Sequence, residues 1–268
     1  MFRAVRLLGE GDPLHVSQDL VSYHLMLDGR HKRLRIPLRT FTLPNGMRML
    51  VTDDVAEAFV INFDENFIFK ENWLLKNYRP PKGGVVVDVG AFCGLYTVTA
   101  AKLVGPKGHV YAVEPAPATF KLLQMNISLN GLKNIVPIER AVADFNGFSN
   151  LYIPHLHSSS SFYSNHLGGF EQVSKVRVTT LDDIIRDYKI LHVDLMKVDI
   201  EGVELAALKG ASDALGKGIV EKVVVELHEP LINYKDVLDY LVTKRFVIEA
   251  VFHPREEIAK KIVYARRM

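Results

Sequence analysis

The sequence has few of the features that mark secreted or membrane proteins. Its one cysteine, Cys93, excludes an intrachain disulfide framework and fits a reducing compartment. No apolar run approaches the ~18 residues of a membrane span. The first residues lack the apolar core of a signal peptide. We therefore expect a cytoplasmic protein that does not associate with membranes, and no pattern indicates an obligate protein partner.

Several signatures of other enzyme classes are also missing. The sequence contains no Gly-x-Ser-x-Gly nucleophile elbow and no phosphate-binding P-loop. His155-x-His157 could suggest a metal, but no cysteine or carboxylate cluster with ligand spacing accompanies it. We therefore predict no metal site.

Acidic residues are absent from one stretch of the chain. The net charge is only +2, yet the residues from Gly29 to Arg48 include no Asp or Glu. The basic residues of this stretch that we single out as a candidate docking surface are Arg30, Lys32, Arg33, Arg35 and Arg39. Such a cluster can bind a phosphate backbone, although a solvated strand face would carry the same residues.

The most informative pattern present is an apolar strand followed by a glycine loop. Apolar residues surround Asp88 in Val85–Val89 and predict a buried strand, after which Gly90 and Gly94 allow a tight turn into a helix. Twenty residues past Gly94, Glu114 ends a second apolar run. A carboxylate at this point binds a ribose diol in nucleotide-binding α/β sheets. The pattern predicts a nucleoside-containing cofactor at the carboxyl edge of a parallel sheet.

The loop itself favours one cofactor. Its pattern is Asp88-x-Gly90-x-x-x-Gly94, which lacks the middle glycine of the dinucleotide fingerprint. An acid before the loop repels a pyrophosphate and suits a cationic ligand. S-adenosylmethionine carries a sulfonium and an ammonium group and no phosphate, so we predict this cofactor. NAD is the alternative cofactor. The non-functional interpretation is a glycine-rich turn that serves packing alone.

The chain divides near residue 80. Residues 1–80 predict a small β-rich unit with a possible role in docking substrate or RNA, because Ser22–Leu27, Lys32–Leu38 and Met47–Val51 alternate apolar and polar residues. Glu71–Tyr78 is predicted to be a helix. A polar loop with aromatic residues, from His155 to Phe170, is either a lid or a surface excursion.

From residue 81 to 268, strands and helices alternate as a doubly wound sheet requires. Strands are expected over 85–89, 109–113, 134–138, 193–198, 219–225, 245–252 and 261–266. Helices are expected over 95–104, 116–130, 181–188, 203–210 and 231–243. The strand over 261–266 would run back against 245–252, a reversal typical of S-adenosylmethionine-dependent methyltransferases.

Seven ordered motifs carry a family likeness. They are Asp88-Val89-Gly90-Ala91, Gly94-Leu95-Tyr96-Thr97, Val113-Glu114-Pro115, Thr179-Thr180-Leu181-Asp182-Asp183, Met196-Lys197-Val198-Asp199-Ile200-Glu201-Gly202-Val203-Glu204, Leu208-Lys209-Gly210-Ala211 and Val225-Glu226-Leu227-His228. Together they resemble the FkbM family of S-adenosylmethionine-dependent methyltransferases, over roughly residues 80–230. The likeness departs at Phe92-Cys93, and residues 1–60 carry none. It implies a seven-stranded, mostly parallel, Rossmann-like α/β fold and methyl transfer to hydroxyl groups of sugars or macrolides.

The fold analogy also implies which residues bind the cofactor. Asp88 is expected near the cofactor's amino group or a loop amide, and Glu114 at the two ribose hydroxyls. The expected cofactor-binding residues are Asp88, Gly90, Ala91, Gly94, Glu114, Ala141 and Val142.

Three residues are candidates for the chemistry. Asp199 and Glu201 follow the strand over 193–198, and His228 follows the strand over 219–225, so all three are expected at the same sheet edge. Methyl transfer needs alignment of nucleophile and sulfonium, and a hydroxyl or amine must also lose a proton. Asp199 could instead cap the following helix, and a lone histidine is often structural.

The acceptor is the least determined part of the prediction. The basic N-terminal stretch favours a base or ribose of RNA, with loop aromatics stacking on a flipped base. An O-methyltransferase acting on a sugar, lipid-linked or small-molecule hydroxyl is the alternative. It agrees with the absence of an Asn/Asp-Pro-Pro-aromatic box, where Asp199-Ile200-Glu201-Gly202 stands instead. The third hypothesis is a scaffold protein that binds the cofactor without catalysis.

Overall fold

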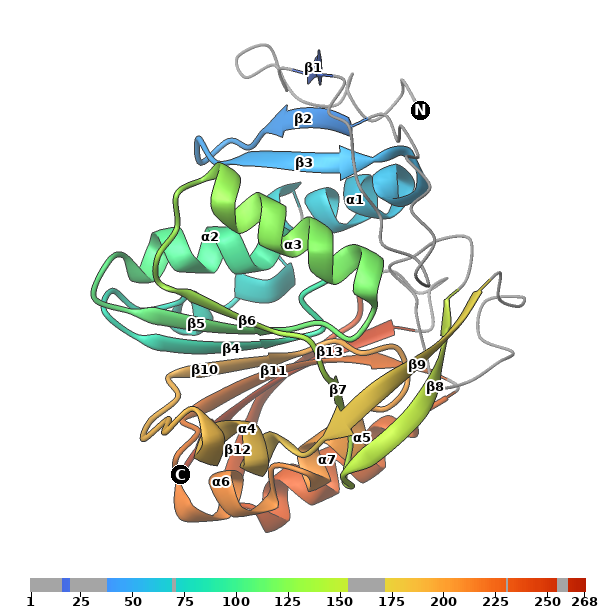
Figure 1. Ribbon diagram of the computed structural model, residues 1–268. Helices are drawn as coiled ribbons and strands as arrows, with labels where there is room; N and C mark the ends of the chain where they lie inside the picture. The colour runs from blue at the N-terminus through green and yellow to red at the C-terminus, as the bar shows by residue number, and fades with distance from the viewer. Residues whose placement is uncertain (1–15, 20–37, 69–70, 154–171, 230, 255–259) are drawn as a thin grey trace.

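The protein is described by a computed structural model over residues 16–19, 38–68, 71–153, 172–229, 231–254 and 260–268 (Figure 1). The predicted strands at Ser22–Leu27 and over most of Lys32–Leu38 lie outside these residues. So do the loop from His155 to Phe170 and the basic residues Arg30, Lys32, Arg33 and Arg35.

A seven-stranded sheet forms the centre of the molecule, in the order β12-β13-β11-β10-β4-β5-β6. The strands are β4 (Val85–Val89), β5 (His109–Val113), β6 (Ile135–Ile138), β10 (Leu195–Val198), β11 (Lys222–His228), β12 (Phe246–Phe252) and β13 (Lys260–Arg267). Its pairs are parallel except that β13 runs antiparallel to both β11 and β12. The predicted sheet, including the reversed last strand, is confirmed.

Helices cover both faces of this sheet because its inner strands are apolar on both sides. The helices α2 (Leu95–Val104) and α3 (Pro117–Leu129) pack with Val86 and Leu195. On the other face, Val87 and Met196 pack with four further helices. These are α4 (Leu181–Asp187), α5 (Glu204–Lys209), α6 (Ser212–Lys217) and α7 (Tyr234–Thr243). Figure 1 shows the two layers above and below the sheet.

The described part of the N-terminal unit packs on the helical layer. It contains the antiparallel strands β1 (Val16–Asp19), β2 (Leu38–Thr42) and β3 (Arg48–Thr52), followed by α1 (Ala56–Phe63). Met49 and Phe59 are buried with Val98 of α2 and Leu122 of α3. The same cluster buries Phe92 and Cys93, where the sequence departs from the family pattern. The domain boundary at residue 80 stays a prediction, because both sides of it share this core.

Several elements differ from the sequence predictions, among them β1, α1 and α6, which were not predicted. Two other differences concern Glu71–Tyr78 and a second sheet. The helix predicted over Glu71–Tyr78 is wrong: two short 3-10 turns, Glu71–Trp73 and Lys76–Tyr78, stand there. Trp73 stacks on Tyr96 at a ring distance of 5.3 Å, and Tyr78 packs edge-on against Tyr264, so tertiary contacts outweigh local helix propensity.

The second difference is a small additional sheet that the sequence did not predict. It joins β7 (Ala141–Val142), β8 (Gly147–Ile153) and β9 (Gln172–Thr179), with β9 in the middle. In Figure 1, β8 and β9 lie side by side as a long antiparallel pair beside the central sheet. Leu151 and Val178 bury one side of it, together with Ala141.

Candidate functional site

The carboxyl ends of β4, β5 and β10 lie next to one another at the glycine loop over residues 90–94. The backbone N–H groups of Gly90 and Ala91 donate to the carbonyl of Val113, and that of Asp199 donates to Val89. Gly90 has φ +86°, and a Cβ atom there would lie 1.8 Å from the carbonyl oxygen of Asp199. Only glycine fits this place, so the cofactor loop and the turn after β10 are held in direct backbone contact.

Glu114 lies at the end of β5 and organises the loop. Its carboxylate accepts hydrogen bonds from the backbone N–H of Phe92 (2.8 Å) and Ala116 (3.0 Å) and from the Thr119 hydroxyl (2.8 Å). Burial raises its pKa despite these donors. Oε1 accepts two of these hydrogen bonds and Oε2 only one, so a lone pair of Oε2 is left for a ribose hydroxyl. Phe92 holds a left-handed φ of +52°, which turns its N–H toward Glu114.

Asp88 is fully buried, and it is bound by side chains rather than by a loop amide. It accepts a hydrogen bond from the Thr97 hydroxyl, and its Oδ1 lies 3.9 Å from Lys197 Nζ, so no loop amide is among these contacts. That Oδ1 has no hydrogen-bond partner. Burial raises the pKa of Asp88 to about 6. An orphaned buried carboxylate oxygen beside the loop fits the ammonium group of the predicted cofactor.

The remaining residues that the sequence predicts to bind the cofactor, Ala91, Gly94, Ala141 and Val142, are all buried. Gly94 begins α2 with φ +93°, and a Cβ atom there would meet Leu123 at 2.5 Å. Ala141 and Val142 are buried in β7, which follows β6. Ala91 is also buried in the loop.

Asp199, Glu201 and His228 come together, as the sequence predicts. His228 Nε2 lies 3.8 Å from Asp199 Oδ1 and 3.5 Å from Glu201 Oε2. Burial disfavours charge on the imidazole, but the surrounding carboxylates of Glu201, Glu204 and Asp199 outweigh it and raise the pKa of His228 well above its ordinary value. Burial also opposes the charge of Asp199, yet Lys197 Nζ at 2.9 Å keeps the pKa of that carboxyl lowered.

Two further carboxylates complete this cluster, and the sequence prediction assigned them no role. Glu204, in the first turn of α5, is completely buried, and its Oε1 lies 2.7 Å from His228 Nδ1. The same oxygen accepts from the Gly202 N–H at 3.0 Å. Glu226 Oε1 lies 3.7 Å from His228 Nε2. A charged residue within an otherwise apolar strand was the available signal for Glu226, as it was for Lys197 on β10.

Lys260 links the cluster to the N-terminal unit. Its ammonium group lies 2.7 Å from Glu226, 2.7 Å from Glu65 and 2.9 Å from Glu71. Lys260 begins β13 and pairs in register with His228 on β11. The segment that follows α1 is thereby tied to the carboxylates around His228.

The turn after β10 is strained. Glu201 has φ +54°, which L-residues rarely adopt, and Gly202 has φ +102°. A Cβ atom at Gly202 would meet Leu231 at 2.6 Å. Backbone of this kind persists where packing holds it, and it is concentrated at functional sites.

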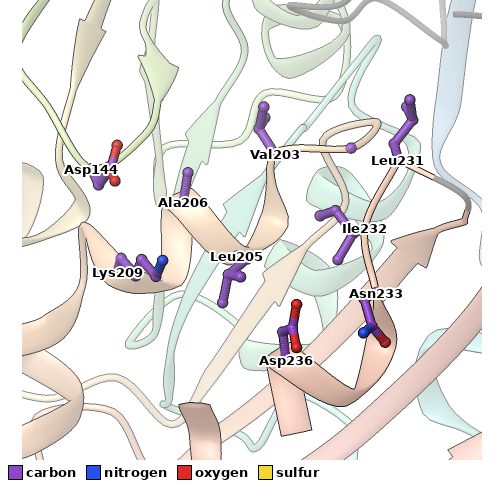
Figure 2. Close-up of a pocket in the computed structure, with 10 residues that line it drawn as sticks. Asp144, Val203, Leu205, Ala206, Lys209, Leu231, Ile232, Asn233 and Asp236 are labelled. Atoms are coloured by element: carbon purple, nitrogen blue, oxygen red, sulfur yellow. The ribbon is translucent and has the colours of Figure 1, made fainter. Parts of the chain in front are cut away.

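A hollow of about 250 Å³ lies beside this turn. It is lined by Asp144, Gly202, Val203, Leu205, Ala206, Lys209, Leu231, Ile232, Asn233 and Asp236. Figure 2 shows residues of α5 along its middle, Ile232, Asn233 and Asp236 on one side, and Asp144 on the other. Its lining mixes charged or amide groups with apolar side chains.

One predicted docking residue is described. Arg39 on β2 pairs with Asp53 at 2.7 Å, so its charge is partly compensated. No described helix is both long and apolar enough to span a bilayer.

Comparison with known proteins identifies relatives over most of the chain. The model of the methyltransferase FkbM domain matches residues 88–248. The chain is 26% identical over 219 residues to methyltransferase sdnD of Sordaria araneosa, covering 69% of this chain and 83% of that protein. It is 28% identical over 227 residues to the 31-O-demethyl-FK506 methyltransferase FkbM of Streptomyces tacrolimicus, covering 72% and 82%. The hexuronic acid methyltransferase AglP of Haloferax volcanii is 28% identical over 173 residues, covering 65% and 67%.

Solved structures are similar at a greater distance. Fibrillarin from Aeropyrum pernix, solved with bound S-adenosylmethionine, matches at 15% identity and a TM-score of 0.47, covering 92% of this chain and 99% of that one. A protein from Clostridium thermocellum described as a putative rRNA methylase matches at 13% identity and a TM-score of 0.48, covering 72% and 90%. These distant likenesses do not support the predicted RNA acceptor, and the sequence relatives agree better with the alternative.

The predicted cofactor, by contrast, agrees with the family and with the buried carboxylates at the loop. This chain belongs to the FkbM methyltransferase family, and its cofactor is S-adenosylmethionine.

Proposed function

We propose that the protein is an O-methyltransferase that methylates a hydroxyl group of a sugar or another small molecule. The observation that carries the proposal is the half-buried cluster of Asp199, Glu201 and His228 at the carboxyl ends of β10 and β11. The names of relatives support the acceptor class, since one is a hexuronic acid methyltransferase and another a 31-O-demethyl-FK506 methyltransferase.

Different residues would bind the cofactor and accept the proton of the acceptor hydroxyl. When bound, S-adenosylmethionine supplies an electrophilic methyl group on a positively charged sulfur. Glu114 would hold the ribose diol and Asp88 the ammonium group, which fixes the cofactor against the glycine loop. The main contribution of such a site is alignment of the acceptor oxygen with the methyl group.

The cluster offers a place for the acceptor and for its proton. Asp199 is kept ionised by Lys197, so its carboxylate can accept a hydrogen bond from a hydroxyl group. The proton that the hydroxyl loses on methylation passes to this carboxylate. We assign the remainder of the acceptor to the hollow beside Gly202, where Asp144, Lys209 and Asn233 offer groups for hydroxyls.

The test is transfer of labelled methyl from S-adenosylmethionine by the purified chain to two acceptor pools. One pool contains sugars, including hexuronic acids, and small hydroxylated metabolites; the other is total RNA from a strain that lacks the gene. We expect label in a methyl ether of the first pool. Label found only in RNA, and lost from the polymer on nuclease digestion, would overturn the proposal in favour of the RNA acceptor.

A further inference from the structure

His228 Nε2 is surrounded by carboxylate oxygens at a spacing longer than a hydrogen bond. Asp199 Oδ1 lies 3.8 Å away, Glu226 Oε1 3.7 Å and Glu201 Oε2 3.5 Å. Hydrogen bonds to nitrogen are usually 2.7–3.2 Å long. In a tetrahedral site with metal–ligand bonds of about 2.1 Å, neighbouring ligand atoms lie about 3.4 Å apart. The spacing is thus close to that of atoms that share one cation.

The other ring nitrogen is oriented as in metal-binding histidines. His228 Nδ1 lies 2.7 Å from Glu204 Oε1, and Glu204 is completely buried. A histidine that ligates a metal through Nε2 usually donates its Nδ1–H to a carboxylate or carbonyl in this way. The second oxygen of this carboxylate, Glu204 Oε2, is buried with no hydrogen-bond partner. The cluster therefore has an uncompensated carboxylate oxygen as well as a pre-oriented imidazole.

The charge balance of the surrounding network favours a cation. Its carboxyl groups are Glu65, Glu71, Asp88, Asp199, Glu201, Glu204 and Glu226, and its lysines are Lys197 and Lys260. Neither lysine blocks the ligand atoms. Lys197 binds Asp199 Oδ2, which leaves Oδ1 directed at His228, and Glu226 Oε1 has a second lone pair besides the one facing Lys260.

A second cluster of similar composition serves as a contrast. His192, Asp194 and Glu221 also lie close enough to share an ion, at the opposite edge of the sheet, where β10 and β11 begin. His192 and Glu221 are about half exposed, at 51% and 43%, and Asp194 Oδ2 already accepts from the Val85 N–H. This group is therefore open to solvent and partly bound by the backbone, unlike the cluster around His228.

We propose that Asp199, Glu226 and His228 bind one divalent transition-metal ion, with Glu204 orienting the imidazole. One imidazole nitrogen with carboxylate oxygens suits ions such as Mn²⁺ and Zn²⁺. An ion at the end of β10 would polarise the acceptor hydroxyl, and this part of the inference rests on the proposed function. Binding itself does not depend on the acceptor.

The experiment measures metal binding without any acceptor. The full chain is treated with EDTA, which is then removed, and titrated with MnCl₂ followed by electron paramagnetic resonance, and separately with ZnCl₂ in a calorimeter. Both titrations are repeated with S-adenosylmethionine. The variants are His228→Gln, Glu226→Gln and Glu204→Gln, with His192→Gln as the matched control. Thermal unfolding checks that each variant is folded.

We expect one ion per chain in the wild type and in His192→Gln. Loss of the orienting carboxylate in Glu204→Gln should weaken binding about 10- to 100-fold, and loss of a ligand in His228→Gln or Glu226→Gln should weaken it further. If a ligand variant does not fold, Glu204→Gln decides, because it keeps all three ligands. Absence of stoichiometric binding in the wild type, or equal binding by all variants, would overturn the proposal. Metal binding by a chain that methylates none of the acceptors would leave this inference standing and remove only the proposed function.

Discussion

Asn126 on α3 pairs with the backbone of Leu50 on β3 as a neighbouring strand would. Its side-chain oxygen accepts from the Leu50 N–H at 2.6 Å, and its amide nitrogen donates to the Leu50 carbonyl at 3.1 Å. The same amide donates to the carbonyl of Cys93 at 2.9 Å, and Asn126 is completely buried. One side chain therefore joins the N-terminal strands to the cofactor loop.

Replacement of this side chain should destabilise the fold. Asn126→Ala leaves backbone groups of Leu50 and Cys93 without partners, and we expect a loss of about 3 kcal/mol in the free energy of unfolding. Asn130→Ala is the matched control, because Asn130 makes the same pair of contacts with Arg48 at an exposed position. Urea denaturation should show a loss of under about 1 kcal/mol for the control. Equal losses for both would show that burial does not set the cost.

The second prediction concerns Asp88 and the pH dependence of stability. Its folded pKa is raised to about 6 from an ordinary value of 3.8. A raised carboxyl pKa means that the folded state binds the proton more tightly than the unfolded state. Its contribution to stability is therefore fully present below pH 3.8 and is lost as the pH rises through about 6.

Asp88→Asn removes this titration. Between pH 4 and pH 7, the stability of the variant relative to the wild type should rise by about 3 kcal/mol, since each pKa unit corresponds to about 1.4 kcal/mol. Chemical denaturation at a series of pH values measures it. Asp213→Asn, at an exposed residue on α6, should show no such rise. A difference between Asp88→Asn and wild type that does not change with pH would contradict the buried-carboxyl account.

The third prediction concerns Glu114 and the cofactor. Glu114→Gln removes the charge that would accept the ribose hydroxyls, and we expect the affinity for S-adenosylmethionine to fall roughly 10- to 100-fold in calorimetry. Glu139→Gln, at an exposed carboxylate just after β6, should leave the affinity unchanged. Wild-type affinity in Glu114→Gln would show that Glu114 serves only to order the loop.

The fourth prediction separates chemistry from cofactor binding. Asp199→Asn keeps the size of the side chain but loses the negative charge, so the rate of methyl transfer should fall about 100-fold or more while S-adenosylmethionine still binds. Single-turnover transfer to the acceptor and calorimetry with the cofactor give the two quantities. Retained turnover would remove Asp199 from the mechanism.

The sequence was sufficient for the central sheet and less so for its additions. Apolar runs such as Val85–Val89 predicted strands, because a strand that is buried on both faces consists mostly of apolar residues. The sheet of β7, β8 and β9 was not predicted, because β8 and β9 are partly polar and are separated by 18 residues. Glu71–Tyr78 was predicted as a helix, but its stacking against Tyr96 and Tyr264 holds it in shorter turns.

The candidate site was likewise predicted only in part. The carboxyl ends of parallel strands meet at one edge, and this rule brought Asp199, Glu201 and His228 together correctly. Glu204, Glu226 and Lys260 could not be assigned, because a single charged residue in an apolar segment does not identify its partner. Lys260 and Glu65 are 195 positions apart in sequence and meet only in the folded chain.

The position of β13 has a consequence for synthesis of the protein. It follows the other strands in the chain, yet it lies between β11 and β12 and supplies Lys260 beside His228. A nascent chain that ends before residue 260 therefore has an open edge on β11 and lacks the Lys260 ammonium group beside Glu226. Such an edge is a template for pairing between chains. On the ribosome, the elements that precede β13 can collapse early. The cluster around His228 is completed only after β13 has emerged from the exit tunnel.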